Sequence, residues 1–502
     1  MIARMVLRRM VWLLLLGLGQ ALDGSTALPQ TPSRPDEARF DPPLGGVYLG
    51  IRLEFEAGAP VIRRVEKAAA AGRDGFQVGD RFLALGEQSG WRSVEEITRD
   101  VRMFTPGRRV DVRVLRGAQE LQIALVPDPL LVRDALDLAE IVRRSRFLSR
   151  QAASGAVLAR LETVVPGLLR QARTESEGLG ILHRELGLLG TSHTAIVPAW
   201  TYQHLMASES DGEGGHATGA LFERRGDAWF VLDVLDGSPA ARAGLLSGDG
   251  IASVQAVAAT ESPRWILAGF EASRGILTLR VEERESLSLG VVRHAGEAPR
   301  TITLAIDRRT SGLGATAASQ RTIERGGRRL LYVHLWNLLS PQVVDIVSVA
   351  LRDTAAPWDG LVLDLRGRGG QVAVLERMAK LLESRAQPTV LLQDRYTRSA
   401  KEILAQRLRD RAEVLVVGER TAGAVLPGSY HHLSNDHMVM LPQDPRDIVR
   451  MSREVVLEGR GVEPEIVVER AGAYSAGADP ILEAGVEVLL KLLQDVPRRR
   501  RL

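Results

Sequence analysis

The sequence predicts a mixed α/β (α+β) protein in which two β-rich modules and a helical segment accompany an α/β core. Short strand patterns separated by turn residues fill residues 43–128 and recur over 217–306. Within 129–216, apolar residues follow the helical period of about 3.6 residues. From 320 to 495, apolar strand patterns alternate with helical patterns, which is typical of a buried, largely parallel sheet. A length of 502 residues is sufficient for about three domains.

Composition restricts the chemistry. Hydrophobic residues make up 45% and charged residues 25% of the chain, as in ordinary globular proteins, whereas aromatic residues make up only 4%, so the core must be aliphatic. Cysteine is absent, which excludes a cysteine nucleophile, a zinc–thiolate site and any disulfide.

The N-terminal residues 1–27 have the pattern of a secretion signal. An apolar stretch over 10–18 is too short to span a bilayer comfortably, and it follows three positive charges, Arg4, Arg8 and Arg9. Small residues come next, so we expect cleavage after Ala21 or Ala27; retention as an uncleaved anchor is the alternative. Residues 28–42 are proline-rich and polar, as expected of a linker.

The net charge gives no sign of a nucleic-acid-binding protein. The formal charge of +3 falls to +1 when residues 1–27 are removed, and the basic tail 496–502 carries four arginines. The rest of the chain is therefore slightly acidic, unlike a nucleic-acid-binding domain. We expect the tail to be a solvated end, with contact to anionic lipid as the alternative. Membrane contact is expected only through the signal segment or this tail.

The α/β core contains a serine at the predicted start of a helix. Residues 360–370 (GLVLDLRGRGG) form a buried strand pattern followed by a glycine-rich loop, and Ser399 precedes the helical pattern downstream. Backbone N–H groups at a helix start lack partners within the helix, so Ala400, with Gly369 or Gly370, could stabilise an oxyanion beside a serine nucleophile. A simple helix cap is the alternative role for Ser399.

Residues 397–403 (TRSAKEI), together with 360–370, resemble the active centre of the C-terminal (tail-specific) processing serine peptidases, whose pattern reads roughly DLRGNGGG followed by SASE. The resemblance implies a crotonase-like ββα peptidase core that hydrolyses peptide bonds through an acyl-enzyme, without a metal or organic cofactor. The chain departs from the pattern at two positions. Arg368 replaces the asparagine of the glycine loop and Gln371 replaces its third glycine, and both changes alter the presumed oxyanion loop.

One branch of this family uses a lysine base in a TFGKG motif after the serine. The corresponding residues 421–425 read TAGAV, so Ala424 occupies the lysine position. Lys401 lies on the same helix as Ser399 and is expected to point elsewhere, and Asp410 is expected at the surface. We therefore expect the serine–lysine scheme to fail, and Lys401→Ala and Asp410→Ala to be mild by comparison with substitutions of the catalytic residues.

The other branch, which resembles the core of the tricorn peptidase, uses a histidine preceded by a serine. Ser192 and His193 match this pair, directly before the second β-rich module. Residues 457–465 (LEGRGVEPE) resemble the family motif EGxGVxPD and supply Glu458. The resemblance implies His193 as the general base, active as pH rises through neutrality, with Glu458 and the Ser192 hydroxyl orienting it. The alternatives are a turn histidine and an exposed loop carboxylate.

Both β-rich modules resemble PDZ domains. In the first, Tyr48, Leu49, Gly50 and Ile51 match the carboxylate-binding loop. In the second, residues 237–249 match the pattern GSPAxxAGLxxGD, whereas its ligand loop at 218–221 is a weak match. The resemblance implies polypeptide partners, including free C-termini, bound by strand addition. His431 and His432 are expected on a turn and not at a metal site.

These observations predict an exported serine endopeptidase of the tail-specific type, in a bacterial periplasm. A catalytically silent peptide-binding scaffold, or a lipid or retinoid carrier on the same fold, is the alternative.

Overall fold

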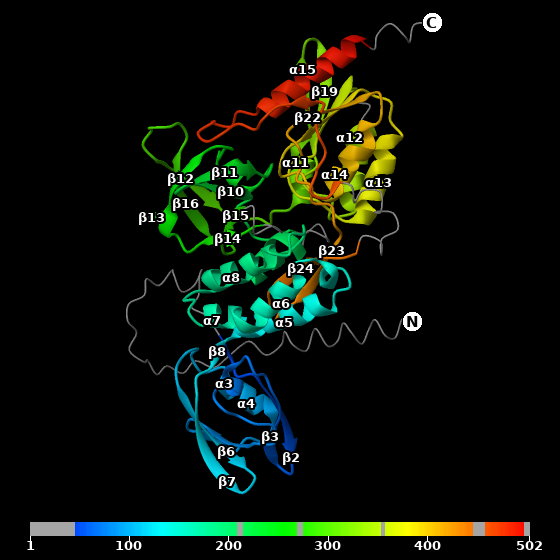
Figure 1. Cartoon of the computed structure of the whole chain (residues 1–502). Coiled ribbons are helices and arrows are strands. Elements are labelled where there is room, and N and C mark those ends of the chain that lie inside the picture. Colours follow the sequence, from blue (N-terminus) through cyan, green and yellow to red (C-terminus); the bar gives the residue numbers. More distant parts are fainter. Residues whose placement is uncertain (1–45, 208–213, 269–274, 353–356, 445–456, 496–502) are drawn as a thin grey trace.

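The computed structural model describes five stretches of the chain, residues 46–207, 214–268, 275–352, 357–444 and 457–495 (Figure 1). The predicted signal, linker and basic tail lie outside the described residues. In Figure 1 the first module lies at one end, the helical segment lies in the middle, and the second module and the α/β core lie side by side beyond it.

The first module is an antiparallel sheet in the order β2-β3-β4-β6-β7, with β5 paired to β4. Alternate valines of β6 are buried, as expected of a strand with one face on the core. Ser93 caps helix α4 by accepting a hydrogen bond from the N–H of Glu96. The elements are β2 (Ile51–Glu56), β3 (Ala59–Val65), α3 (Ala70–Arg73), β4 (Arg81–Leu85), β5 (Gln88–Ser89), α4 (Val94–Val101), β6 (Val110–Arg116) and β7 (Gln119–Leu125).

The helical segment packs against strands that come from a much later part of the sequence. A short ladder of β1 (Val47–Tyr48) with β8 (Asp128–Pro129) connects it to the first module, so the predicted boundary falls inside β8. Its helices are α5 (Leu130–Arg144), α6 (Ser154–Thr163), α7 (Val165–Leu169) and α8 (Glu175–Gly187). They share an apolar core with a three-stranded sheet in the order β23-β24-β9, whose strands are β9 (Ala195–Val197), β23 (Gly428–His432) and β24 (Met438–Pro442). His431 and His432 therefore lie in a strand, and the turn expected there is wrong.

The second module repeats the topology of the first. Its strands run β10-β11-β12-β16-β17, with β13 on β12, which corresponds strand by strand to the order in the first module. Where the first module has α4, the second has a hairpin of β14 (Trp265–Leu267) and β15 (Leu277–Leu279). The other elements are β10 (Ala220–Arg225), β11 (Ala228–Val234), α10 (Pro239–Arg242), β12 (Gly250–Val254), β13 (Val257–Ala258), β16 (Ser286–Val292) and β17 (Arg300–Ala305).

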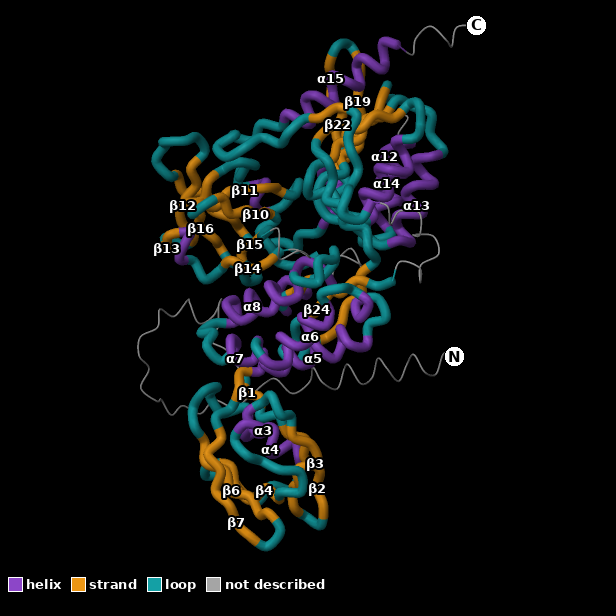
Figure 2. The backbone as a smooth tube through the Cα atoms, in the orientation of Figure 1, coloured by secondary structure: helices purple, strands orange, loops and turns teal. Residues whose placement is uncertain are grey.

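The α/β core is a six-stranded sheet in the order β18-β19-β20-β21-β22-β25, parallel from β19 onward (Figure 2). Helices α12, α13 and α14 cover one face, and α15 covers the other. The carboxyl ends of β20 and β21 therefore lie side by side. The glycine loop follows β20, and the segment that leads to Ser399 follows β21. The elements are α11 (Gly312–Ser319), β18 (Arg321–Arg325), β19 (Arg328–His334), α12 (Gln342–Arg352), β20 (Gly360–Asp364), α13 (Val372–Glu383), β21 (Thr389–Gln393), α14 (Ala400–Arg409), β22 (Val414–Gly418), β25 (Ile466–Val467) and α15 (Pro480–Asp495).

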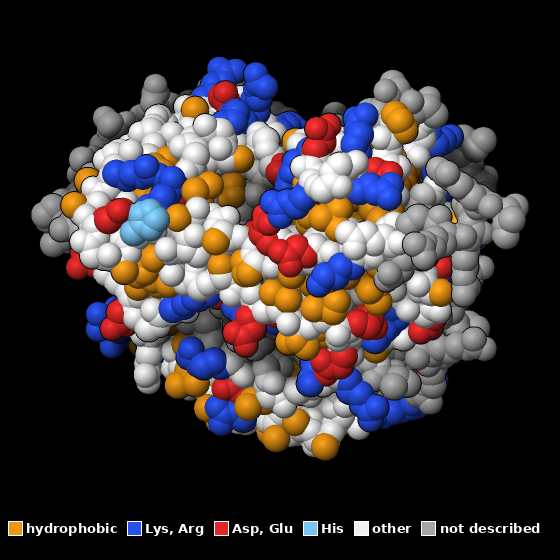
Figure 3. All heavy atoms as spheres, turned by 90° about the horizontal axis from the view of Figure 1, so that it is seen from above, with side chains coloured by type: hydrophobic (Ala, Val, Ile, Leu, Met, Phe, Trp, Pro, Cys, Tyr) orange, Lys and Arg blue, Asp and Glu red, His pale blue; other side chains and the backbone are white. Residues whose placement is uncertain are grey.

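On the face that carries α15, basic and acidic side chains alternate with small apolar groups (Figure 3). Among the described residues, no helix is long and apolar enough to cross a bilayer.

A buried ion-pair network joins the second module to the core. The Arg470 guanidinium donates to Asp233 Oδ1 of β11 at 2.6 Å and also to Asp394, which follows β21. The Arg470 side chain is only 8% exposed, and Asp394 is fully buried. Burial raises the pKa of Asp233, and the nearby Asp394 carboxylate adds to that shift. Arg470 therefore compensates two buried carboxylates that would otherwise repel each other.

We predict that Arg470→Met destabilises the protein by about 3–5 kcal/mol, because it leaves two buried carboxylates without their shared cation. Denaturant unfolding measures this loss. Arg325→Met is the matched control, since Arg325 pairs with Glu483 on the surface, where such a pair contributes about 0–1 kcal/mol. Equal destabilisation by the two variants would contradict a structural role for the buried network.

Candidate active site

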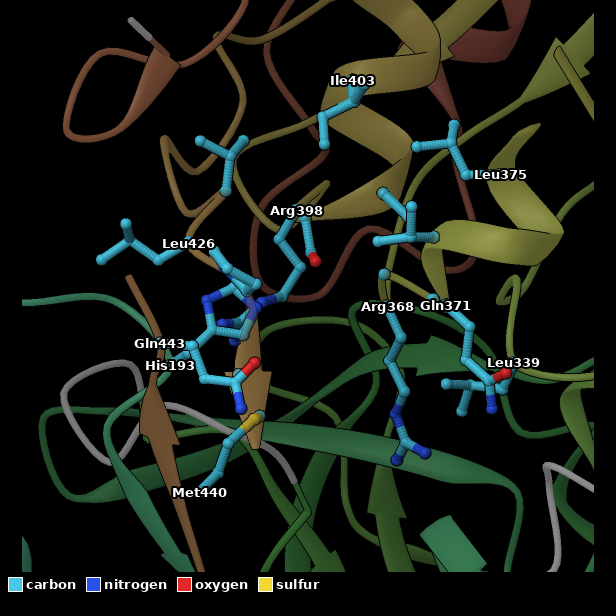
Figure 4. A pocket seen from close by; sticks show the side chains of 18 of the residues that line it. His193, Leu339, Arg368, Gln371, Leu375, Arg398, Ile403, Leu426, Met440 and Gln443 are labelled. Atoms are coloured by element: carbon cyan, nitrogen blue, oxygen red, sulfur yellow. The ribbon is translucent and has the colours of Figure 1, made fainter. Parts of the chain in front are cut away.

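A cavity of about 470 Å³ opens where the core and the helical segment meet strands β23 and β24 (Figure 4). Ser399, His193 and Gly369 all line it, although they come from three separate parts of the sequence. Aliphatic side chains form much of the remaining wall, among them Leu339, Val372, Leu375, Ile403, Val425 and Leu426. The cavity therefore combines reactive groups with an apolar surface that can accept a side chain of a peptide.

Ser399 occupies the N-cap position of α14, but its backbone is not that of an ordinary cap. Its φ of 56° and ψ of −127° differ from those of Ser93, which caps α4 with an extended φ of −150° and ψ of 164°. A non-glycine residue with positive φ is strained, and such residues cluster at functional sites. The surrounding contacts must therefore hold this conformation in place.

Glu402 provides those contacts. Its buried carboxylate accepts hydrogen bonds from three backbone N–H groups, those of Ser399 at 3.0 Å, Ala424 at 2.8 Å and Gly423 at 2.6 Å. The Thr421 hydroxyl donates to it at 2.6 Å. The Ser399 N–H also donates to the Ala424 carbonyl at 2.9 Å. Glu402 thus joins the start of α14 to the loop 421–424.

His193 is connected to Glu458 through Ser192. The Ser192 hydroxyl donates to Glu458 Oε2 at 3.0 Å. The hydroxyl oxygen of Ser192 also lies 3.0 Å from His193 Nδ1. A hydroxyl has only one hydrogen to donate, so Ser192 Oγ must accept from Nδ1–H. This fixes the neutral tautomer of His193 that carries its proton on Nδ1 and leaves Nε2 with a lone pair, as a general base requires.

The Glu458 carboxylate organises this corner of the site. It accepts from the backbone N–H of Ser192 at 3.1 Å, of Val425 at 2.8 Å and of Leu426 at 3.1 Å, in addition to the Ser192 hydroxyl. These donors belong to segments that lie far apart in the sequence. Glu458 is therefore no free surface carboxylate, as the alternative interpretation would require.

The glycine loop approaches Ser399 closely. A Cβ atom on Gly369 would lie 2.6 Å from the Ser399 Cβ, and one on Gly370 would lie 2.3 Å from the Leu338 Cβ. The loop is held by Leu338, whose N–H donates to the Gly369 carbonyl at 3.0 Å and whose carbonyl accepts from Gln371 at 2.9 Å. Only glycine fits at both positions. Ala400, the first residue of α14, lies next to Ser399, and its N–H is one of the groups at the helix start that have no partner within the helix.

Comparison with known proteins agrees with this geometry. Residues 376–468, which include Ser399 and Glu458, match the model of peptidase family S41. A carboxyl-terminal-processing protease of Picosynechococcus sp. is 25% identical over 291 residues, covering 53% of this chain and 67% of that protein. The carboxy-terminal processing protease CtpB of Bacillus subtilis is 24% identical over 281 residues, covering 49% of this chain and about half, 54%, of that protein.

Residues 376–468 of this chain therefore resemble a peptidase family S41 domain, and both relatives are carboxyl-terminal processing proteases. Among solved structures, the photosystem II D1 C-terminal processing protease aligns with a TM-score of 0.41 and 20% identity, over 68% of this chain and 93% of that one. The predicted resemblance to C-terminal processing peptidases is confirmed. His193 lies outside the residues matched by the family model, so its assignment depends on the geometry above.

Lys401 points away from Ser399, as expected. Its Nζ donates to the carbonyls of Arg366 at 2.8 Å and Trp336 at 3.1 Å, and burial lowers the pKa of Lys401 to about 7. The burial of Lys401 argues against the expectation that Lys401→Ala is mild, because truncation would leave a cavity and remove the Nζ donor from the Trp336 carbonyl. The Arg366 carbonyl would keep its hydrogen bond with His334 Nε2. Asp410 ends α14 and is exposed, as expected.

The loop proposed for carboxylate binding in the first module lies far from this cavity. Gly50, with a φ of 76°, packs so closely that a Cβ there would lie 2.2 Å from the Ala69 Cβ. Leu49 and Gly50 each accept a hydrogen bond through their carbonyls, and the Tyr48 hydroxyl accepts one from Arg133 at 3.2 Å. Ile51 then begins β2, an edge strand of its sheet. The loop is therefore rigid and leads directly into an edge strand.

Sequence reasoning missed Glu402 and Arg398. The signal for Glu402 was present, since a serine followed three residues later by a glutamate is the capping-box pattern. Arg398 is buried and lines the cavity beside His193 (Figure 4), and no local pattern indicates that orientation.

The surroundings of His193 favour its neutral form. The ring is buried, and this burial, followed by the positive charge of Arg398, lowers the pKa of His193 well below its ordinary value. A base must be unprotonated to accept a proton, so His193 is ready to act at neutral pH. The direction of this shift moves the expected rise of activity from neutrality to lower pH.

We predict that kcat/KM rises with pH through an ionisation clearly below 6.5 and stays level through neutrality. Arg398→Gln removes a positive charge that disfavours the imidazolium, so the acid limb should move to higher pH. The pH dependence of kcat/KM measures both effects. Arg395→Gln serves as the control, because Arg395 pairs with Glu419 at the surface. An unmoved acid limb in Arg398→Gln would separate Arg398 from the ionisation of the base.

Proposed function

We propose that this S41 serine-type peptidase is an exported endopeptidase of the tail-specific type that uses Ser399 as nucleophile and His193 as base. The observation that carries the proposal is the continuous hydrogen-bonded chain from Glu458 through Ser192 to His193, in the cavity that Ser399 also lines. The order of partners resembles a catalytic triad with one additional hydroxyl.

In the proposed reaction, His193 Nε2 accepts the proton of the Ser399 hydroxyl while Oγ attacks the scissile carbonyl carbon. The tetrahedral intermediate places its negative charge near the N–H groups of Ala400 and of Gly369 or Gly370. The imidazolium returns its proton to the leaving amine, and the acyl-enzyme forms. Water then repeats the sequence with His193 as base, which releases the carboxylic acid and restores Ser399.

Glu458 would act through Ser192 during both steps. When His193 becomes an imidazolium, Nδ1–H continues to donate to Ser192 Oγ, and the Ser192 hydroxyl continues to donate to Glu458. The negative charge of Glu458 therefore stabilises the developing positive charge from one residue away. The three backbone N–H groups that donate to Glu458 hold that carboxylate in position.

The family acts on polypeptides, and the first module gives a structural reason for recognition of chain ends. Its loop Tyr48–Ile51 precedes an edge strand, so a peptide could extend the sheet while its terminal carboxylate meets the loop N–H groups. The secretion pattern of residues 1–27 supports export, and both matched relatives are bacterial.

We predict that Ser399→Ala and His193→Ala each lower kcat by about 10³–10⁶-fold, because members of a catalytic unit are not additive. Glu458→Gln, which keeps the shape and removes the charge, should lower kcat by about 10²–10⁴-fold with little change in KM. Lys401→Met, which preserves side-chain volume, and exposed Asp410→Ala should retain most activity. Steady-state kinetics on one denatured protein substrate compare all five variants.

A fluorophosphonate probe tests the same proposal independently, because a peptide-binding scaffold or a carrier would have no activated serine. Labelling should occur in the wild type and vanish in Ser399→Ala. If Lys401→Met abolishes cleavage while His193→Ala preserves it, the histidine mechanism is refuted.

We further predict that amidation of a peptide's C-terminus weakens its binding to the protein, since an amide lacks the charge that the loop N–H groups would receive. Calorimetry on Ser399→Ala, which cannot degrade the peptide, compares the acid and amide forms. Equal affinities would exclude carboxylate recognition by this loop.

A further inference from the structure

The two β-rich modules differ at one edge of otherwise equivalent sheets. In the first module β2 forms the edge, and α4 lies nearby. In the second module the equivalent strand β10 is not an edge, because β15 pairs with it and β14 pairs with β15. The hairpin thus occupies the position where an added peptide strand would lie.

The hairpin is firmly held in this position. Phe222 of β10 pairs with Leu277 of β15, and the Thr278 hydroxyl donates to the Ala220 carbonyl at 3.0 Å. Trp265 of β14 stacks on Trp229 with ring centroids 4.4 Å apart, and its indole N–H donates to the Ala259 carbonyl at 2.7 Å. The ring stacking and the hydrogen bonds to backbone carbonyls together make the hairpin an integral part of the module.

Arg368 connects the hairpin to the active site. Its guanidinium donates through Nη2 to the carbonyl of Ala268, directly after β14, and through Nη1 to the carbonyl of Leu205, both at 3.1 Å. Arg368 belongs to the same loop as Gly369 and Gly370, and Figure 4 shows its side chain pointing from that loop toward the second module. The loop residue therefore binds two carbonyls that do not belong to the core.

We propose that the β14–β15 hairpin is a permanent internal strand of the second module, and that Arg368 uses it to hold the glycine loop in its active shape. Arg368 is then a positioning residue, and the second module needs no bound peptide to support catalysis. This inference depends on the proposed function, because it assigns a role to the loop that would stabilise the oxyanion.

The physical reason lies in the geometry of the donors. An oxyanion-stabilising N–H must be fixed within about 0.5 Å of its productive position. The hydrogen bonds with Leu338 hold one side of the loop, at Gly369 and Gln371. The two hydrogen bonds of Arg368 hold the other side, and its planar guanidinium can make both without losing further conformational freedom. Loss of one side would allow the loop N–H groups to move away from the oxyanion.

The first test measures the rate at which an uncharged alkyl fluorophosphonate labels the protein. Ser399 Oγ attacks phosphorus, its proton passes to His193, and fluoride leaves, so labelling needs the oxyanion donors but no peptide recognition. Arg368→Met should label and cleave about 10²-fold more slowly, with an unchanged KM and an unmoved pH profile. Arg368→Lys, which can make one of the two bonds, should recover part of the rate. Arg377→Met, on the exposed side of α13, should label like the wild type.

Unchanged labelling of Arg368→Met would overturn the inference. If its labelling is unchanged while KM rises for substrates with acidic residues, Arg368 instead binds substrate. If the wild type shows no Ser399-dependent labelling, the proposed function itself fails, which is a distinct outcome.

The second test asks whether the hairpin must leave. Because the chain has no cysteine, the double variant F222C/L277C contains a single possible disulfide, between two residues that face each other across β10 and β15. The oxidised and reduced forms of this protein should cleave a peptide at the same rate. Loss of activity on oxidation, with recovery on reduction, would show that the hairpin must leave the edge and would refute its permanent role.

Discussion

The geometry of the site depends on one loop, residues 421–426, held at both ends by carboxylates. Glu402, from the helix that follows the serine, binds the N–H groups of Gly423 and Ala424. Glu458 binds those of Val425 and Leu426. Each carboxylate also binds one catalytic segment, Glu402 through the N–H of Ser399 and Glu458 through Ser192. The loop therefore sets the separation between nucleophile and base.

The two carboxylates meet different electrostatic conditions, although both accept several backbone donors. Glu402 is buried, and this burial raises its pKa, an effect that its four hydrogen bonds oppose. Glu458 is only half-buried and begins the hydrogen-bonded chain that ends at His193. In the proposed mechanism His193, which is buried beside Arg398, stays neutral until a proton arrives from Ser399. The imidazolium would then be stabilised by Glu458, which can act through Ser192 without touching the ring.

The sequence predicts those features that local patterns or motifs encode. The glycine loop, Ser399 and Glu458 are identifiable because their spacing matches a known family, and helices such as α12 and α13 follow from periodicity. Pairings between distant segments are not encoded locally. Strand β9 joins β24 across more than two hundred residues, and β15 joins β10 where the first module has a helix. The orientation of Lys401 is likewise hidden, because a lysine on a helix is usually exposed, whereas tertiary packing buries this one.

The two possible bases in this site show why geometry must be considered before pKa. Lys401 is near neutrality in its pKa and lies two residues from the nucleophile, so a ranking by ionisation alone would select it. Its Nζ, however, donates to two backbone carbonyls just beyond the ends of β19 and β20. His193 has a less suitable pKa for proton transfer at neutral pH, yet it lines the cavity with Ser399 and has its tautomer fixed by Ser192. A base must reach the proton that it removes. In the other branch of the family the loop after the serine carries a lysine. Here that position is Ala424, and the loop contributes backbone N–H groups that bind Glu402 and Glu458.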